Sequence, residues 1–241
     1  MLRYSICLLA MLCCAHSHAQ LRVAVAANFA ETLTELAADY SISSGDKVTV
    51  IRGSSGKLYA QIVQGAPFDI FFSADVDRPK ALEANGLIVT GSRQTYALGQ
   101  LVLWPASGDA ETALRAFAYA RFAIANPRLA PYGKSALEVL TRLGVLEKAQ
   151  SRLVRGENIS QAYQYVFSGN ADAGLLSRSQ MGGNDEYWVI PAGWYTPIEQ
   201  QRVVIKNSEN KAAAMRFLAF MQTQASRARI LAAGYQLPGV D

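Results

Sequence analysis

Beyond its first 19 residues the sequence contains neither cysteine nor histidine. All three cysteines and both histidines lie at positions 7 to 18, in a segment that starts with a basic residue, Arg3, and continues as an apolar run. The segment ends in Ser17-His18-Ala19, with small residues at the two positions that a signal peptidase recognises. This pattern is typical of a secretory signal peptide, and we predict that residues 1–19 are removed before Gln20.

The missing residue types exclude several classes of chemistry from the mature chain. Without cysteine or histidine it has no disulfide, no thiol nucleophile, no histidine-based catalytic triad and no zinc site built on these side chains. Loss of Arg3 leaves 22 basic against 19 acidic side chains, a net charge of +3 with no basic block, which gives nucleic-acid binding little support. No apolar run after residue 19 is long enough to span a bilayer, so we expect an exported, soluble protein without membrane insertion.

Short strand-like segments alternate with helical ones along the mature chain. Alternating or continuous apolar runs at 21–26, 48–51 and 68–72 predict strands, and each precedes a predicted helix. Two extended stretches, near 97–101 and 197–202, are long enough to cross from one sheet to another. The sequence therefore predicts an α/β fold of two lobes, each with a mostly parallel sheet flanked by helices, and a ligand cleft between the lobes.

The two crossings set the expected lobe boundaries. Lobe I should comprise residues 20–98 plus 202–241, so that it includes both ends of the mature chain, and lobe II should comprise residues 99–201. Within lobe I, a short helix over 78–85 is expected to begin with Asp77 as its N-cap.

Four strand-to-helix turns are the strongest candidates for a functional site. They are Ala27-Asn28, Ser54-Ser55-Gly56, Ala130-Pro131-Tyr132-Gly133 and Glu157-Asn158-Ile159-Ser160. In open α/β sheets ligands bind beyond the carboxyl ends of the strands, and a helix N-terminus offers unpaired N–H groups with a partial positive charge. Two turns from each lobe can converge on an anion, with Asn28 and Ser55 adding side-chain donors. The alternative is that these residues only cap their helices.

Other motifs give weaker signals. Gly133-Lys134-Ser135 resembles the end of a phosphate-binding P-loop, but Arg128 occupies the place of the glycine that the full pattern requires. Asp75 and Asp77 fit no calcium loop. An aromatic cluster around Trp194 is compatible with sugar stacking or with core packing. None of these patterns predicts catalysis, a cofactor or a metal site.

Several stretches together resemble a known family. Val23 to Phe29, Gly53 to Gly56, Gly65 to Asp75 and Asn126 to Gly133 occur in this order, and Ala232-Ala233-Gly234-Tyr235 follows near the end. Over essentially the whole mature chain, the sequence resembles the periplasmic molybdate-binding proteins of bacterial molybdate ABC importers (the ModA family). The resemblance implies a type II periplasmic-binding-protein fold, with two αβ lobes joined by a hinge of two crossing strands.

The same resemblance implies a set of site residues. Asn28 would donate from its side chain and backbone, and Ser55 from its hydroxyl and backbone N–H group. Tyr132 and Ile159 would contribute backbone N–H groups from the second lobe. Ala27 stands where some members carry a Thr or Ser hydroxyl, so that only its backbone can act here. Together these residues would hold a tetrahedral oxyanion with neutral hydrogen-bond donors.

The implied function is transport and not catalysis. The resemblance implies a monomeric periplasmic binding protein that captures molybdate, and by similar size tungstate, and delivers it to an inner-membrane ABC permease. No cofactor is expected, and molybdenum would be held only as the molybdate oxyanion, without a direct protein ligand to the metal. The alternatives are a sulfate or thiosulfate binder of the same fold, an exported phosphate-ester enzyme, and a binder of a small organic acid, which would need a basic residue to grip the carboxylate.

The first prediction concerns processing and assembly. We expect the protein recovered from the periplasm to be a monomer that begins at Gln20 and contains no disulfide, because the predicted cut removes every cysteine. Intact-mass measurement and size-exclusion chromatography of periplasmic material test this. A chain that retains residues 1–19, or that carries lipid at Cys13 or Cys14, would contradict it.

Overall fold

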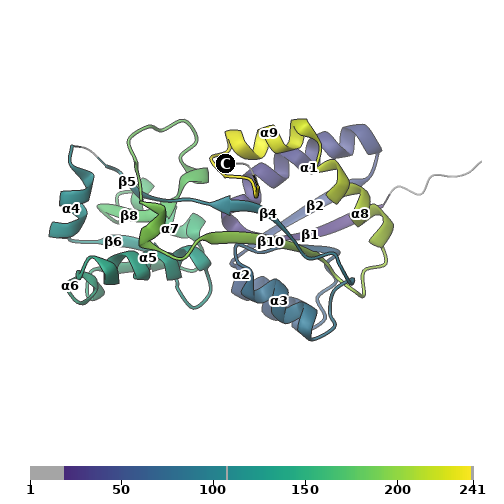
Figure 1. Cartoon of the computed structure of the whole chain (residues 1–241), viewed down its shortest axis with the longest axis horizontal. Helices are drawn as coiled ribbons and strands as arrows, with labels where there is room; N and C mark the ends of the chain where they lie inside the picture. Colours follow the sequence, from purple (N-terminus) through teal and green to yellow (C-terminus); the bar gives the residue numbers. More distant parts are fainter. Residues whose placement is uncertain (1–18, 107, 240–241) are drawn as a thin grey trace, which may run out of the picture.

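The computed structural model describes residues 19–106 and 108–239, and Figure 1 shows the chain as two lobes side by side. The predicted signal peptide falls almost entirely on residues 1–18, outside the described residues. Each lobe contains one five-stranded sheet with helices packed on it. The two-lobed α/β fold predicted from the sequence is therefore confirmed.

The first lobe is built on a sheet with the strand order β2-β1-β3-β10-β4. Its strands are β1 (Gln20–Ala26), β2 (Lys47–Gly53), β3 (Ile70–Phe72), β4 (Gln94–Gly99) and β10 (Ile198–Val204). Helices α1 (Ala30–Ser44), α8 (Lys211–Phe220) and α9 (Gln224–Ala232) cover one face, and α2 (Ser55–Val63) and α3 (Asp77–Ala84) cover the other. Because successive strand residues point to opposite faces, Val23 and Val25 pack with α1 while Ala24 packs with α2.

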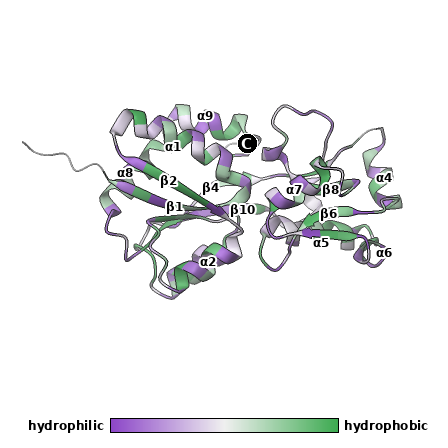
Figure 2. Cartoon of the chain, turned by 180° about the vertical axis from the view of Figure 1, so that it is seen from behind, coloured by the Kyte–Doolittle hydropathy of each residue, from purple (hydrophilic) through white to green (hydrophobic). Residues whose placement is uncertain are grey.

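The second lobe has a sheet with the order β7-β6-β8-β5-β9. Its strands are β5 (Leu101–Trp104), β6 (Phe122–Ala125), β7 (Leu153–Gly156), β8 (Ala173–Ser177) and β9 (Trp188–Val189), and its helices are α4 (Ala110–Ala116), α5 (Pro131–Arg142), α6 (Leu146–Gln150) and α7 (Ile159–Phe167). β5, β6 and β8 are buried along their whole length, as expected for strands covered on both faces. Figure 2 shows hydrophobic residues along β6 and a mixture of hydrophilic and hydrophobic residues on α1 and α9. None of the helices that the structure describes is long and apolar enough to cross a membrane.

Both sheets are mixed and not mostly parallel, which corrects the prediction from the sequence. β1 pairs in parallel with β2 and β3, and β6 pairs in parallel with β7 and β8. The other pairs, β10 with β3 and β4, and β5 with β8 and β9, are antiparallel. The physical reason is the route of the chain: β4 leads out of the first lobe into β5, and β10 leads back, so these strands run against their neighbours.

The two crossings between the lobes lie beside one another. β4 ends at Gly99 and β5 begins at Leu101, and Ile198 at the start of β10 pairs with Gly99. Gly99 has no room for a side chain, because a Cβ there would collide with the Tyr132 hydroxyl and would lie 2.9 Å from Gln200 Nε2. The hinge is therefore packed tightly against the start of α5 in the second lobe.

Some short elements differ from the prediction. Helices α4 and α6 were not predicted, because they have seven and five residues and are too short for a clear apolar period. Asp77 is the first residue of α3 and makes no side-chain cap bond, so its predicted role as N-cap is wrong. Val76 is the N-cap, and the Asp75 carboxylate just before it accepts a hydrogen bond from the Arg78 backbone N–H group at 3.2 Å and pairs with the Arg78 guanidinium.

Replacing Gly99 by alanine should destabilise the hinge. The added methyl group would displace a buried hydroxyl or amide, and overpacking of this kind costs about 1–3 kcal/mol. Gly193→Ala is the matched control, since nothing lies within 4 Å of a Cβ built there, and its free energy of unfolding should change by less than about 0.5 kcal/mol. Urea unfolding measures both variants, and equal stability would contradict the close packing at Gly99.

Candidate functional site

A small cavity lies where the 3₁₀ helix η1 (Ala27–Phe29) and the starts of α2, α5 and α7 meet. Its lining residues are Ala26, Ala27, Asn28, Ser54, Ser55, Ala74, Ala130, Pro131, Tyr132, Asn158 and Ile159. The space open to the centre of a water-sized molecule is about 10 Å³, and the total empty space is about 200 Å³. The five site residues predicted from the sequence all line this cavity, so the fold brings together residues from four separate turns.

Ser55 presents a hydroxyl hydrogen to the cavity. Ser54 is the N-cap of α2, where its side chain accepts from the Lys57 N–H group at 3.4 Å, and this leaves Ser55 as the first helical residue. The Ser55 side chain is 1% exposed, and its Oγ accepts a hydrogen bond from the Ala74 N–H group at 3.0 Å. A hydroxyl that accepts a backbone N–H group keeps its own hydrogen free to donate.

The backbone donors come from helix starts in both lobes. Among the described residues, the N–H groups of Ser55, Tyr132 and Ile159 donate to no other residue. Tyr132 follows Pro131, which has no N–H group and fits the first helical position, so its own N–H group is the first donor of α5. Asn158 caps α7 by accepting from Gln161 N at 3.0 Å, which leaves Ile159 at the helix start. Three helix N-termini therefore direct partial positive charge at the cavity, which makes it suited to an anion.

The Asn28 side chain is arranged differently from the donor role that the resemblance implied. It is 4% exposed, and its Nδ2 donates to Gln200 Oε1 at 2.8 Å and to the Tyr235 hydroxyl at 3.1 Å. The Tyr235 hydroxyl in turn donates to the Asn28 backbone oxygen at 2.7 Å. In this arrangement the amide nitrogen binds the protein interior and does not face the cavity as a donor.

The two lobes touch each other around the cavity. The Gly56 N–H group of α2 donates to the Leu129 carbonyl oxygen in the second lobe at 2.9 Å. On another side the Ser179 hydroxyl of the second lobe donates to the Asn28 backbone oxygen at 3.1 Å. These contacts close the cleft and shield the cavity from solvent.

No charged side chain lines the cavity within the described part of the chain. Lys57 and Glu157 lie at its rim and form an ion pair at 2.7 Å between the lobes, and Asp75 pairs with Arg78. Across residues 19–106 and 108–239, no group of three or more metal-ligating side chains is present. An anion in this cavity would be held by neutral donors alone.

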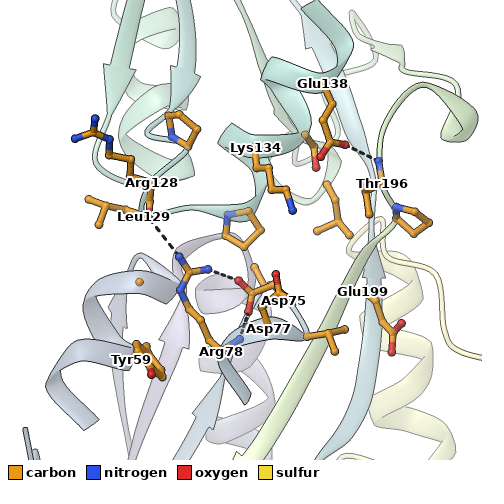
Figure 3. Close-up of a pocket in the computed structure, with 18 of the residues that line it drawn as sticks. Tyr59, Asp75, Asp77, Arg78, Arg128, Leu129, Lys134, Glu138, Thr196 and Glu199 are labelled. Carbon is orange, nitrogen blue, oxygen red and sulfur yellow. Dashed lines mark hydrogen bonds and ion pairs between the residues drawn. The ribbon is translucent and has the colours of Figure 1, made fainter. Parts of the chain in front are cut away.

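Two larger grooves flank the cavity. One of about 740 Å³ shares Ala74 with it, and another of about 730 Å³ shares Asn28. Figure 3 shows the first groove, in which the Arg78 guanidinium reaches from the first lobe to the Arg128 carbonyl oxygen at 3.3 Å and the Lys134 side chain extends into the open space. The cavity is therefore the narrow part of a longer space between the lobes.

The residues that support the site from behind were not predicted from the sequence. Ala74 holds the Ser55 hydroxyl, and Gln200 and Tyr235 hold the Asn28 amide. These partners are 19, 172 and 207 positions away from the residues they hold. No local pattern reports such distant pairs, although Ala74 and Tyr235 fall within stretches that carried the family resemblance.

The fold and the site define a class of protein. Two αβ lobes, joined by crossing strands and enclosing a cavity lined by helix N-termini, are the architecture of a two-lobed solute-binding protein. In agreement, the model of a family described as "Bacterial extracellular solute-binding protein" matches residues 21–236.

Relatives narrow this class further. The molybdate-binding protein ModA of Rhodobacter capsulatus is 43% identical over 217 residues, 88% of this chain and 86% of that protein. ModA of Azotobacter vinelandii is 39% identical over 238 residues, 94% of each protein. The solved structure of the Azotobacter vinelandii periplasmic molybdate-binding protein matches with a TM-score of 0.86 at 40% identity, covering 90% of this chain and 99% of that one. The chain belongs to the ModA family of bacterial extracellular solute-binding proteins.

More distant structures share the fold alone. The sulfate-binding protein SubI of Mycobacterium tuberculosis matches with a TM-score of 0.74 at 14% identity, covering 92% of this chain and 88% of that one. This likeness extends the two-lobed architecture to other solute-binding proteins and says nothing about which solute this chain binds.

Gly56→Ala should hinder closure of the cleft. A Cβ on Gly56 would lie 3.1 Å from the Leu129 Cα and carbonyl oxygen, and both are backbone atoms of the other lobe. Relieving this overlap requires a shift of a few tenths of an ångström between the lobes, at a cost of about 1–3 kcal/mol to the closed state. Because the mature chain has no cysteine, labels on Ile42→Cys and Phe167→Cys, two exposed positions in different lobes, report the distance by fluorescence energy transfer.

With an anion bound, the Gly56→Ala protein should show lower energy transfer than the parent, and the Gly193→Ala control should match the parent. Equal transfer in all three proteins would mean that the Gly56–Leu129 contact is not part of the closed state.

Proposed function

We propose that this protein captures molybdate, and by similar size and charge tungstate, in the periplasm and delivers it to an inner-membrane ABC permease. The observation that carries the proposal is the cavity between the lobes, which is lined by neutral donors and by no charged side chain of the described chain. The ModA relatives named above are molybdate-binding proteins, which supports this choice of ligand. The protein acts as a monomeric carrier, without a cofactor and without catalysis.

The donor set matches a fully deprotonated tetrahedral oxyanion. The Ser55 hydroxyl and N–H group, with the Tyr132 and Ile159 N–H groups, supply donors from both lobes. Hydrogen bonds to an ionised acceptor are roughly twice as strong as neutral ones, and three helix N-termini add a favourable field. The negative charge can therefore be stabilised without a lysine or arginine counter-ion, and molybdenum is held only through its oxygen atoms.

Closure links binding to transport. An anion that touches donors of both lobes stabilises the closed arrangement, because it binds the open arrangement through only one set of donors. The lobes proposed to move are residues 20–98 plus 202–241 and residues 99–201, with the hinge at the paired crossings. The closed shape is the form that the permease recognises.

The alternatives have less support. A phosphate-ester enzyme would need a base, a nucleophile or a metal at the cavity, and its lining residues offer only hydroxyls, two amides and backbone groups. A binder of organic acids would need a basic side chain there, whereas Lys57 is paired with Glu157 at the rim. A sulfate binder of the same fold remains the rival within the class, and the selectivity experiment below separates the two.

Ser55→Ala should weaken molybdate binding by about 1–3 kcal/mol, the cost of removing one donor to a buried charge. The fold should persist, because Ser54 continues to cap α2. Ser168→Ala is the control, since the Ser168 hydroxyl donates to the Gln164 carbonyl oxygen at the exposed end of α7. Calorimetric titration with molybdate compares the parent, Ser55→Ala and Ser168→Ala. Unchanged affinity in Ser55→Ala would show that Ser55 is not a donor to the anion.

Phosphate should be strongly rejected. At neutral pH phosphate carries at least one proton, and a buried P–OH group that faces only donors stays unpaired, which costs about 1–3 kcal/mol or more. Glu157 and Asp75, the nearest carboxylates considered as acceptors, are occupied by Lys57 and Arg78. Sulfate should be rejected less strongly, by size alone, and molybdate and tungstate should bind about equally.

Competition between phosphate and molybdate from about pH 6 to about pH 8 tests this selectivity. Comparable affinities for the two anions would require an acceptor in the cavity and would overturn the donor-only site. A preference for sulfate over molybdate would instead favour the rival within the class.

A further inference from the structure

A cluster of buried polar side chains lies behind the cavity and joins both lobes to the hinge. Gln200 of β10 is fully buried, and its Oε1 accepts hydrogen bonds from Asn28 Nδ2 at 2.8 Å and from the Tyr96 hydroxyl at 3.0 Å. Asn28 Nδ2 also donates to the Tyr235 hydroxyl at 3.1 Å. Tyr132, at the start of α5 in the other lobe, brings its buried hydroxyl to the same place.

Two groups in this cluster lack partners. Among the described residues, neither Gln200 Nε2 nor the Tyr132 hydroxyl makes a hydrogen bond, although both are buried. Both groups crowd the same point, because a Cβ on Gly99 would lie 2.9 Å from Gln200 Nε2 and would collide with the Tyr132 hydroxyl. Burial raises the pKa of Tyr132 well above its usual value, so the hydroxyl keeps its proton. Buried polar groups without hydrogen bonds are unfavourable, and a change that pairs them would be favoured.

The orientation of the Asn28 amide is also unsuited to an anion. Its nitrogen is bound to Gln200 and Tyr235, so the end of the amide that these residues leave free is the carbonyl oxygen, an acceptor. An anion in the cavity needs donors. A side-chain amide has nearly the same shape after half a turn, which exchanges its oxygen with its two N–H groups.

We propose that the amides of Asn28 and Gln200 turn over together when the oxyanion binds, an inference that rests on the proposed function. Asn28 Nδ2 then donates to the anion, and Asn28 Oδ1 accepts from Gln200 Nε2 and from the Tyr235 hydroxyl, which before the turn accepts from Nδ2. Gln200 Oε1 takes the place beside Tyr132 and accepts a hydrogen bond from its hydroxyl. The Tyr96 hydroxyl accepts from Gln200 Nε2 and donates to the Ser73 carbonyl oxygen, which lies 3.4 Å away. Both unpaired groups gain partners, and the anion gains a donor.

Gln200 is in this scheme a positioning residue. It does not line the cavity, but it decides which end of the Asn28 amide faces the anion. Gln200 lies on the hinge strand β10 and receives the hydroxyl of Tyr132 from the second lobe, so the turned network is complete only when that lobe is in place. The bound anion therefore stabilises the hinge as well as the contacts between the lobes.

The orientation of Gln200 can be read directly by NMR of the mature protein, stripped of anion and then saturated with molybdate. In the bound protein the Gln200 side-chain NH₂ protons should show NOEs to the Tyr96 ring, and the Asn28 NH₂ resonances should shift strongly. The two amides are assigned by the loss of their signals in Gln200→Met and Asn28→Ala. NOEs from the Gln200 NH₂ protons to the Tyr132 ring in the bound protein would overturn the proposal.

A double-mutant cycle tests whether Gln200 acts through Asn28. Gln200→Met should lower molybdate affinity about 10-fold in the parent, and less than about twofold in the Asn28→Ala protein. Tyr132→Phe removes only the hydroxyl, and should weaken binding in the parent but not in Gln200→Met. If Gln200→Met lowers molybdate affinity equally in the parent and in the Asn28→Ala protein, the role of Gln200 is merely structural and the proposal is overturned.

Molybdate binding by the parent protein distinguishes a failure of this inference from a failure of the proposed function. If the parent protein binds molybdate but the NOEs or the cycle fail, only the coupled amides are wrong. If the parent does not bind molybdate, the proposed function fails and the inference fails with it.

Discussion

Three helix N-termini meet at one buried point, and the electrostatic repulsion among them is the constraint on this structure. The N-terminus of α2 comes from the first lobe and those of α5 and α7 from the second, and each carries a partial positive charge. With nothing between them, these ends and their free N–H groups are both mutually repelling and unsatisfied. An anion removes both penalties at once, so the same groups that bind it also drive the lobes together.

The neighbouring charges are arranged to leave this field undisturbed. Lys57 and Glu157 neutralise each other across the rim, and Arg78 neutralises Asp75, so that no full charge of the described chain competes inside the cavity. Neutral donors of fixed direction distinguish anions by their protons and their size, whereas a lysine would attract any anion. The absence of a counter-ion from the cavity is therefore the feature from which we argue selectivity.

Local patterns predicted the parts of the fold that depend on neighbouring residues. The strand-to-helix turns containing Ser55, Tyr132 and Ile159 follow from runs of apolar residues and helix-start signals, and they meet as the sheet-edge rule requires. The mixed sheets could not be predicted, because strand direction in β10 depends on the path of the chain through the other lobe. The orientation of the Asn28 amide could not be predicted from the sequence either, since its hydrogen-bond partner Gln200 is 172 positions away.

Counting the protons exchanged on binding shows whether neutral donors alone hold a fully deprotonated oxyanion. Molybdate binding is titrated calorimetrically in buffers of different ionisation enthalpy, from about pH 6 to about pH 8. We expect no net uptake or release of protons and an affinity for molybdate that does not change with pH, because no charged side chain of the described residues lines the cavity. Proton exchange on binding, or an affinity that falls as the pH rises, would show that a charged group holds the anion, so that neutral donors alone do not.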